Sequence, residues 1–233
     1  EALEKGLKEQ GLATDFVRLK EGITRINIKI KTQRETEINT QGAAITEEKL
    51  EELLEKLDRL REGDILVVSG NIPNTLPKNT YDVMLERLSG RGIRYVIDAT
   101  GERLKGALKY RPFFIKPNRD ELEALFGTAI RSERELGEAA EKLRELGARN
   151  VLVSLGEKGA YLLCENGASY RMEAVRRQVK NTVGAGDSMV AGFLAGYLQS
   201  GDYENALKLG VAAGSATACS EGLASKEKIK AFF

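Results

Sequence analysis

The most informative part of the chain is Asn181-Thr-Val-Gly-Ala-Gly-Asp-Ser-Met-Val-Ala-Gly-Phe193, which reads as a strand end, a glycine turn and a helix. Gly184, Ala185 and Gly186 are small, so their backbone N–H groups can approach an anion closely. The helix directs its free N–H groups and the positive end of its dipole to the same point. Asp187 follows in the first helical turn. Donors for a moving phosphoryl group beside a carboxylate base are what phosphoryl transfer requires.

A purely structural explanation of this segment also exists, because many G-x-G turns only pack a helix on a strand and many helix-start Asp residues are caps. Small residues recur along the predicted helix, so its start can lie close to a sheet; they are Ala191, Gly192, Ala195 and Gly196. The chain contains neither a G-x-x-x-x-G-K-[ST] loop nor a G-x-G-x-x-G fingerprint. A nucleotide would therefore need a different cradle.

The segment resembles the D-T-x-G-A-G-D signature of the ribokinase-like (PfkB) carbohydrate kinases, with Asn181 where many members have Asp. Its variant is most similar to the branch with the bacterial 1-phosphofructokinases, and 6-phosphofructokinase and tagatose-6-phosphate kinase are nearby. Five further matches follow the family order; they are Gly22–Ile30, Ser69–Pro73, Lys116–Glu121, Val153–Gly159 and Val211–Ser215. The resemblance covers essentially the whole chain.

Hydrophobic patterning predicts an α/β fold. Apolar runs typical of buried parallel strands alternate with helical patterns; these runs are Ile65–Val68, Tyr95–Ile97, Phe113–Ile115 and Val151–Val153. Ser132-Glu-Arg-Glu135 is a capping box that starts one of the helices, and Ala160–Cys164 is expected to form a hairpin with the strand before it. This order predicts a mostly parallel sheet covered by helices on both faces, with sites at the carboxyl ends of its strands.

The amino-terminal part follows another pattern. Three alternating stretches, Asp15–Lys20, Thr24–Lys31 and Glu35–Asn39, predict antiparallel strands after an opening helix. The resemblance implies a single three-layer ribokinase-like kinase domain over residues 1–233, in which residues 15–40 form a small β lid. The family's first strand and its Gly-Gly-Lys-Gly or Gly-Gly-Lys-Asn motif are not among these residues, so an incomplete amino terminus is expected.

The resemblance implies roles in catalysis and nucleotide binding. Asp187 would be the general base, and Gly184, Ala185 and Gly186 would form the anion hole. The N-x-x-E pair Asn118 and Glu121 would position the triphosphate of ATP and Mg²⁺, with Glu121 acting through bound water. A capping box at a helix start explains the same pair without any ligand. Six further residues would bind ATP; they are Ser154, Gly156 and Gly159 at a strand end, Asn181, and Val211, Gly214 and Ser215 in a helix that borders the adenine.

Three residues are expected at the sugar phosphate. Arg25 suits the phosphate through forked hydrogen bonds, although it could equally be a solvated lid arginine beside Glu21 or Glu35. Ser69 and Asn39 would contact the sugar or its phosphate. Asp98 either tunes the water shell of Mg²⁺ or caps a turn.

Composition excludes several classes of function. The 36 basic and 35 acidic residues balance, so a nucleic-acid-binding face is not expected. Nothing in the sequence predicts a membrane span. Histidine is absent, which favours a carboxylate base, and Cys164 and Cys219 suggest buried thiols of a cytoplasmic protein.

The predicted function is ATP-dependent phosphorylation of fructose 1-phosphate to fructose 1,6-bisphosphate. The alternatives are fructose 6-phosphate or tagatose 6-phosphate as the acceptor and, in another class, a non-catalytic sensor of a sugar phosphate or nucleotide. The alternating lid strands leave an exposed edge, and the resemblance implies a homodimer formed through the lid.

Overall fold

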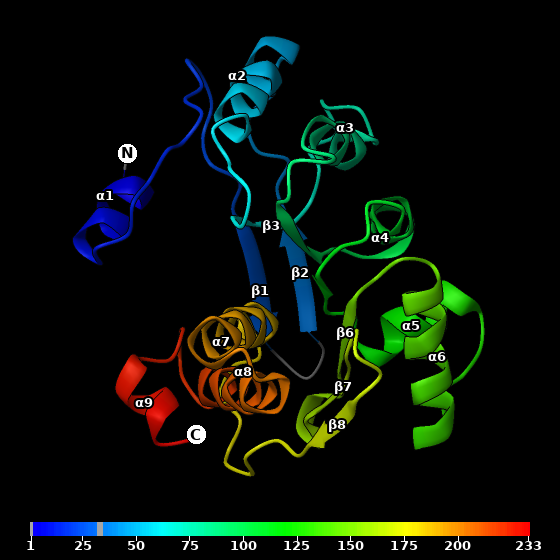
Figure 1. Cartoon of the computed structure of the whole chain (residues 1–233). Coiled ribbons are helices and arrows are strands. Elements are labelled where there is room, and N and C mark those ends of the chain that lie inside the picture. The colour runs from blue at the N-terminus through cyan, green and yellow to red at the C-terminus, as the bar shows by residue number, and fades with distance from the viewer. Residues whose placement is uncertain (1, 32–34) are drawn as a thin grey trace. The chain divides into compact units, whose positions relative to one another are not determined.

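The computed structural model describes residues 2–31 and 35–233, and these residues form two compact units (Figure 1). The first unit contains Glu1–Asp64 and Asn71–Ile93, and the second contains Ile65–Gly70 and Arg94–Phe233. The single kinase domain expected over the whole chain stays a prediction.

The first unit holds three helices and a two-stranded antiparallel sheet; its elements are α1 (Ala2–Glu9), β1 (Asn27–Lys31), β2 (Glu35–Asn39), α2 (Glu47–Leu57) and α3 (Thr80–Arg87). Ile28 lies opposite Ile38 across the two strands, and each side chain is 47% exposed. Thr46 caps α2 by accepting a hydrogen bond from the N–H of Lys49 at 3.3 Å. The two strands of the expected lid are therefore present.

The strand predicted at Asp15–Lys20 is wrong. This segment has no regular secondary structure, and Phe16 and Leu19 remain 43% and 37% exposed. Asp15 instead forms ion pairs with Lys56 and Arg59 at the carboxyl end of α2. Alternation of apolar and polar residues specifies a strand only where a neighbouring strand takes up its hydrogen bonds, and this segment contacts a helix.

The second unit is built on a six-stranded sheet whose order follows the sequence; its strands are β3 (Ile65–Ser69), β4 (Arg94–Asp98), β5 (Phe114–Ile115), β6 (Asn150–Ser154), β7 (Ala160–Leu163) and β8 (Ser169–Met172). The first four strands are parallel, and β7 and β8 continue the sheet antiparallel. This arrangement confirms the mostly parallel sheet and the hairpin after β6.

Helices cover both faces of this sheet (Figure 1). The helices of the second unit are α4 (Gly101–Leu108), α5 (Arg119–Phe126), α6 (Glu133–Glu145), α7 (Ala185–Ser200), α8 (Tyr203–Ala218) and α9 (Lys226–Lys230). On one face, α7 packs on the sheet, and the ring of Phe193 stacks on that of Phe114 with centroids 4.2 Å apart. On the other face lie α4, α5 and α6, and α6 begins with the predicted capping box of Ser132 and Glu135.

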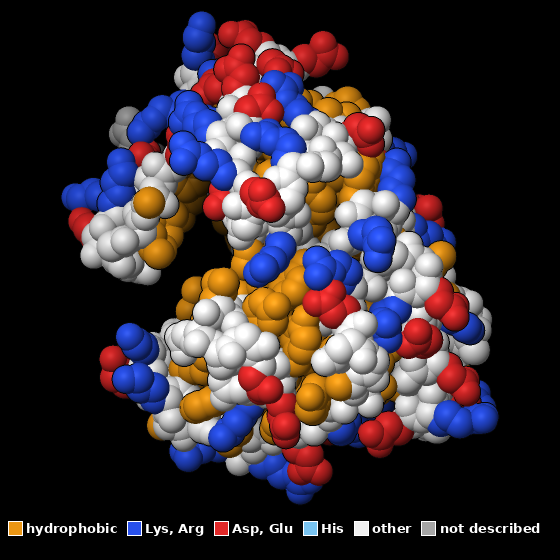
Figure 2. All heavy atoms as spheres, in the orientation of Figure 1, with side chains coloured by type: hydrophobic (Ala, Val, Ile, Leu, Met, Phe, Trp, Pro, Cys, Tyr) orange, Lys and Arg blue, Asp and Glu red, His pale blue; other side chains and the backbone are white. Residues whose placement is uncertain are grey.

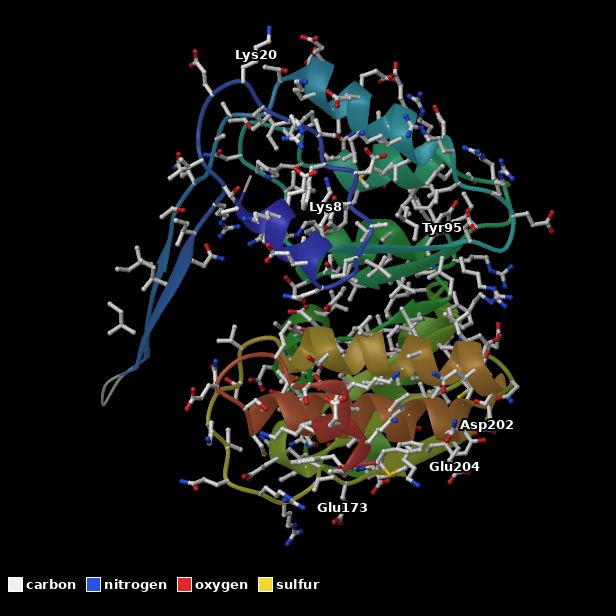
Figure 3. The ribbon with its side chains drawn as sticks, turned by 90° about the vertical axis from the view of Figure 1, so that its left-hand side faces the viewer. Lys8, Lys20, Tyr95, Glu173, Asp202 and Glu204 are labelled. Atoms are coloured by element: carbon white, nitrogen blue, oxygen red, sulfur yellow. The ribbon has the colours of Figure 1, made fainter. Side chains whose placement is uncertain are left out.

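Small residues let α8 lie directly against α7. A Cβ atom on Gly192 would come within 2.7 Å of the Leu209 carbonyl oxygen, and one on Gly196 within 2.8 Å of the Ala206 Cα. Asp202 caps α8 through the N–H of Asn205 at 2.6 Å, and Figure 3 shows it beside Glu204 at the start of this helix. The close contact fixes the first turn of α7.

Charged side chains of both signs are interspersed over the face shown in Figure 2. Within the described residues, none of the helices combines the length and the apolar character that a membrane crossing needs.

Candidate active site

Polar residues from neighbouring strands meet at the carboxyl edge of the parallel sheet. Ser69 ends β3 and lies in register with Asp98, which ends β4. Lys116 follows β5 directly, and Asn118 forms a parallel bridge with Ser154 at the end of β6. The crevice at the carboxyl ends of the strands is where open α/β sheets bind ligands, so the structure brings four predicted residues to one edge.

The glycine turn leads into α7 as predicted. Gly184 adopts φ +77° at the N-cap of the helix, and no side chain caps the first turn. The N–H of Ala185 donates to the Thr182 carbonyl oxygen at 3.2 Å, whereas no hydrogen bond is recorded within the described residues for the N–H groups of Gly186 and Asp187. The free donors therefore belong to Gly186 and Asp187, and the sequence analysis had included Ala185 in their place.

Asp187 presents an exposed carboxylate beside these two donors. Its neighbour Ser188 is held by a hydroxyl–hydroxyl contact of 2.8 Å to Thr217, which is 1% exposed. Thr217 also accepts a hydrogen bond from the N–H of Ala224 at 3.2 Å. These bonds tie the first turn of α7 to the carboxyl end of α8 and orient the turn that carries the carboxylate.

Asn181 fastens the segment before the turn. Its N–H donates to the Ala218 carbonyl oxygen at 3.1 Å, and its side-chain amide donates to the Glu221 carbonyl oxygen at 3.0 Å. The Leu223 side chain from the same loop lies where a Cβ atom on Gly184 would fall, at 2.7 Å. Asn181 therefore positions the turn, and its assignment to ATP binding stays a prediction.

A buried ion pair joins Asp98 and Lys116, whose Nζ and Oδ1 atoms are 3.4 Å apart. Burial raises the pKa of the Asp98 carboxyl above its usual value, the Lys116 ammonium opposes that rise, and the nearby Asp187 adds to it. Desolvation disfavours the charged form of an acid, and a second carboxylate acts in the same direction. Asp98 thus lies within electrostatic reach of the predicted base.

Asn118 and Glu121 form the capping box of α5. The Asn118 Oδ1 atom accepts from the N–H of Glu121 at 2.8 Å, and the Glu121 Oε2 atom accepts from the N–H of Asn118 at 2.8 Å. The structural explanation is therefore realised. The Asn118 amide nitrogen and the second Glu121 oxygen have no hydrogen bond recorded in the described part of the chain, so both atoms are available to a ligand.

The loop after β6 contains two glycines in different surroundings. Gly156 has φ +59°, and nothing lies within 4 Å of a Cβ atom built there. Gly159 has φ +85°, and a Cβ atom would come within 2.0 Å of the Met172 carbonyl oxygen. Gly159 thus lets the end of β8 approach, whereas only Gly156 leaves open space beside the site.

The predicted adenine residues of α8 are buried in helix packing. Val211 is 2% exposed and belongs to the core between α7 and the sheet. A Cβ atom on Gly214 would lie 3.1 Å from the Ala185 carbonyl oxygen, and the Ser215 hydroxyl accepts from the N–H of Val175 at 3.3 Å. Their contact with adenine stays a prediction.

Arg25 and Asn39 belong to the first unit, so their part in the sugar site also stays a prediction. The Arg25 Nε atom donates to the Thr40 carbonyl oxygen at 3.0 Å beside the β1–β2 hairpin. Asn39 ends β2, and its side chain lies outside the described residues.

No group of three or more acidic, Cys or His side chains gathers to hold a metal ion among the residues described. Mg²⁺ keeps several waters and usually takes one or two protein carboxylates together with phosphate oxygens. The free Glu121 oxygen, with Asp98 at the same edge, fits that mode of binding.

Residues 1–230 match the family described as pfkB family carbohydrate kinase. The chain belongs to this family. It is 45% identical to the 1-phosphofructokinase of Bacillus subtilis (strain 168) over 230 residues, which are 99% of this chain and 75% of that protein. It is 35% identical to the D-tagatose-1-phosphate kinase of Bacillus licheniformis, over 97% of this chain and 74% of that protein.

The fold agrees with that assignment. The crystal structure of phosphofructokinase-2 from Escherichia coli in complex with substrates and products superimposes with a TM-score of 0.92 at 27% identity, covering 99% of this chain and 76% of that one. The α/β fold with a mostly parallel sheet and a small antiparallel pair, expected from the resemblance, is confirmed, and the protein is a sugar kinase that uses ATP.

Proposed function

We propose that the protein transfers the γ-phosphoryl group of ATP to fructose 1-phosphate and forms fructose 1,6-bisphosphate. The free N–H groups of Gly186 and Asp187 beside the Asp187 carboxylate carry this proposal. They supply a hole for the moving group and a base for the attacking hydroxyl at one helix start. The relatives named 1-phosphofructokinase support the choice of sugar phosphate.

In this mechanism the Asp187 carboxylate accepts the proton of the sugar hydroxyl as its oxygen attacks the γ-phosphorus. The N–H groups of Gly186 and Asp187 bind the oxygens of the phosphoryl group. Asn118 and Ser154 hold the triphosphate at the adjoining strand ends, and Arg25, Asn39 and Ser69 hold the sugar phosphate. Bound Mg²⁺ would neutralise phosphate charge, with Glu121 orienting one of its waters.

The acceptor is identified by a coupled assay for ADP with fructose 1-phosphate, fructose 6-phosphate, tagatose 1-phosphate and tagatose 6-phosphate. We expect the largest kcat/KM with fructose 1-phosphate. A larger value with a tagatose phosphate would transfer the assignment to that sugar, and absence of turnover with all four would refute the proposed substrate class. A protein that binds ATP and a sugar phosphate without turnover would be the sensor.

Replacing Glu121 by Gln tests whether this residue serves Mg²⁺ or only the helix. Glutamine still accepts the hydrogen bond from the Asn118 N–H, so we expect an unchanged unfolding temperature. The Mg²⁺ concentration for half-maximal activity should rise about tenfold, because residues that orient metal ligands typically contribute 10–100-fold. Titration of activity with Mg²⁺ measures the effect.

Glu135→Gln is the matched control, because Glu135 occupies the same position in the capping box of α6 and accepts from the Ser132 N–H at 2.9 Å. It should leave the Mg²⁺ dependence unchanged. An identical Mg²⁺ dependence in the Glu121→Gln protein would reduce Glu121 to a helix cap.

We also propose a homodimer formed through β1 and β2. Ile26, Ile28, Ile30 and Ile38 are between 42% and 53% exposed on this pair of strands, and exposed apolar strands are typical of interfaces. Light scattering at micromolar concentration should give the mass of a dimer. The double substitution Ile28→Asp and Ile38→Asp should give a monomer.

Leu198→Asp, at an apolar α7 residue that is 65% exposed, is the control for this experiment and should remain dimeric. A monomeric unmodified protein would contradict the proposal. We further infer a cytoplasmic location, which is supported by two free, buried thiols; burial raises the pKa of the Cys164 thiol to about 12.

A further inference from the structure

Lys116 reaches from the end of β5 to the first turn of α7. Its Nζ and Cε atoms lie 3.2 and 3.5 Å from the position of a Cβ atom built on Gly186. The side chain is only 9% exposed. The ammonium is therefore held against the same turn that presents the free N–H groups of Gly186 and Asp187.

This position is electrostatically unfavourable for a cation without an anion beside it. The amino end of a helix carries a partial positive charge, which repels a cation. A buried ammonium also needs a partner to replace its lost hydration. Among the described residues, Asp98 is the only recorded ion-pair partner of Lys116, through a single contact of 3.4 Å.

The donors at this point exceed the acceptors that the chain supplies. An ammonium has three N–H donors, and Asp98 offers one contact to them. The two backbone N–H groups at the start of α7 add two further donors with no recorded acceptor in the described chain. An anion with several oxygens, placed beside Gly186, would satisfy both sets of donors together.

We propose that Lys116 is a catalytic residue whose ammonium binds the phosphoryl group during its transfer, while Asp98 holds the side chain in place. The inference rests on the proposed function, because the phosphoryl donor must enter at the start of α7. The sugar oxygen forms the new bond to phosphorus, and the bond from phosphorus to the ADP oxygen breaks with its electron pair on ADP. The proton passes to Asp187, and Lys116 keeps its own protons.

A fixed cation at this place acts on the transition state. Negative charge in phosphoryl transfer is spread over the three oxygens of a loosely bound phosphoryl group. A preorganised positive charge lowers the barrier because it needs no rearrangement during the reaction. The competing explanation is structural: Lys116 and Asp98 would only join the ends of β5 and β4.

Lys116→Met separates the two explanations. We expect kcat to fall about a hundredfold, the size of effect seen when one donor to a transition-state oxyanion is removed, with a change of about threefold or less in the Kd of ADP. Aluminium fluoride, a mimic of the phosphoryl group in flight, should tighten binding of ADP and Mg²⁺ to the unmodified protein in calorimetry. It should not tighten their binding to the Lys116→Met protein.

Two variants calibrate the result. Lys116→Arg keeps the charge and should recover part of both effects. Lys105→Met removes a lysine from an exposed α4 ion pair with Glu102 and should change neither. A Lys116→Met protein with nearly unchanged kcat and a normal response to aluminium fluoride, but a lower unfolding temperature, would overturn the proposal in favour of the structural role.

A pair of neutralised variants covers the case in which Lys116→Met does not fold. Asp98→Asn with Lys116→Met leaves no unpaired buried charge, and its comparison with Asp98→Asn alone isolates the lysine. An equal aluminium fluoride response in these two proteins would also overturn the proposal. The titration uses ADP without sugar, so it decides the role of Lys116 even if no ketohexose phosphate is phosphorylated and the proposed function fails.

Discussion

Asp187→Asn should lower kcat by about 10²–10⁴-fold, the contribution typical of a positioned general base. Asparagine has nearly the same shape and cannot accept the proton of the attacking hydroxyl. The two free N–H groups at the start of α7 remain, so nucleotide binding should persist. Steady-state kinetics together with calorimetry of ADP binding measure both quantities.

Asp202→Asn is the matched control for this substitution. Asp202 is also an acid at the start of a helix, where it caps α8 by accepting from the Asn205 N–H, and asparagine caps equally well. This variant should keep both its stability and its turnover. Turnover of the Asp187→Asn protein within a few-fold of the unmodified protein would remove Asp187 from the chemistry.

The same substitution has an electrostatic consequence at the sheet edge. Asp187 contributes to the raised pKa of Asp98, so its replacement by a neutral residue should lower that pKa toward its usual value. The direction is set by the loss of a like charge near a buried carboxyl. Observation of the Asp98 carboxyl by NMR across a pH titration would detect this shift.

Local patterns in the sequence predicted much of the site. The glycine turn before α7, the capping box of α6 and the strands β3, β4 and β6 each depend on residues within a few positions of one another. Capping and strand patterns of this kind are local. The position of Asn118 beside Ser154 follows from parallel pairing at a shared edge.

Contacts between distant residues could not be predicted in this way. The pairing of Lys116 with Asp98, the approach of Lys116 to Gly186 and the bond from Ser188 to Thr217 depend on how separate elements pack. The engagement of the Ala185 N–H by Thr182 depends on the turn geometry alone. Two signals were nevertheless present, because a lysine and an aspartate each followed directly at the end of a predicted buried strand.

Short or polar elements were also not predicted. The α4 helix has 8 residues and the α9 helix has 5, so neither shows two full repeats of a helical apolar pattern. The β8 strand, Ser-Tyr-Arg-Met, has no buried residue. Such segments acquire their structure from the neighbours on which they pack, because isolated helices of this length are marginal in water.

Gly159→Ala should unfold much of the protein. The new Cβ atom would lie 2.0 Å from the Met172 carbonyl oxygen and 2.6 Å from the Ala174 nitrogen, and both are backbone atoms that cannot rotate away. The φ of +85° adds strain for any residue with a side chain. Strain and overpacking together should lower the free energy of unfolding by about 3–5 kcal/mol, a large part of the 5–15 kcal/mol typical of a domain. Urea unfolding followed by circular dichroism measures this loss.

Gly156→Ala is the control three residues earlier in the same loop. Its φ is +59°, and no heavy atom lies within 4 Å of the added Cβ atom, so it should cost only the 1–2 kcal/mol or so of a left-handed backbone. Equal losses of stability at the two positions would contradict the packing role of Gly159. The resemblance gives both glycines to the nucleotide phosphates, but only Gly156 borders open space. In folded protein, the KM for ATP should therefore rise in Gly156→Ala, whereas Gly159→Ala should lose activity in proportion to its unfolded fraction.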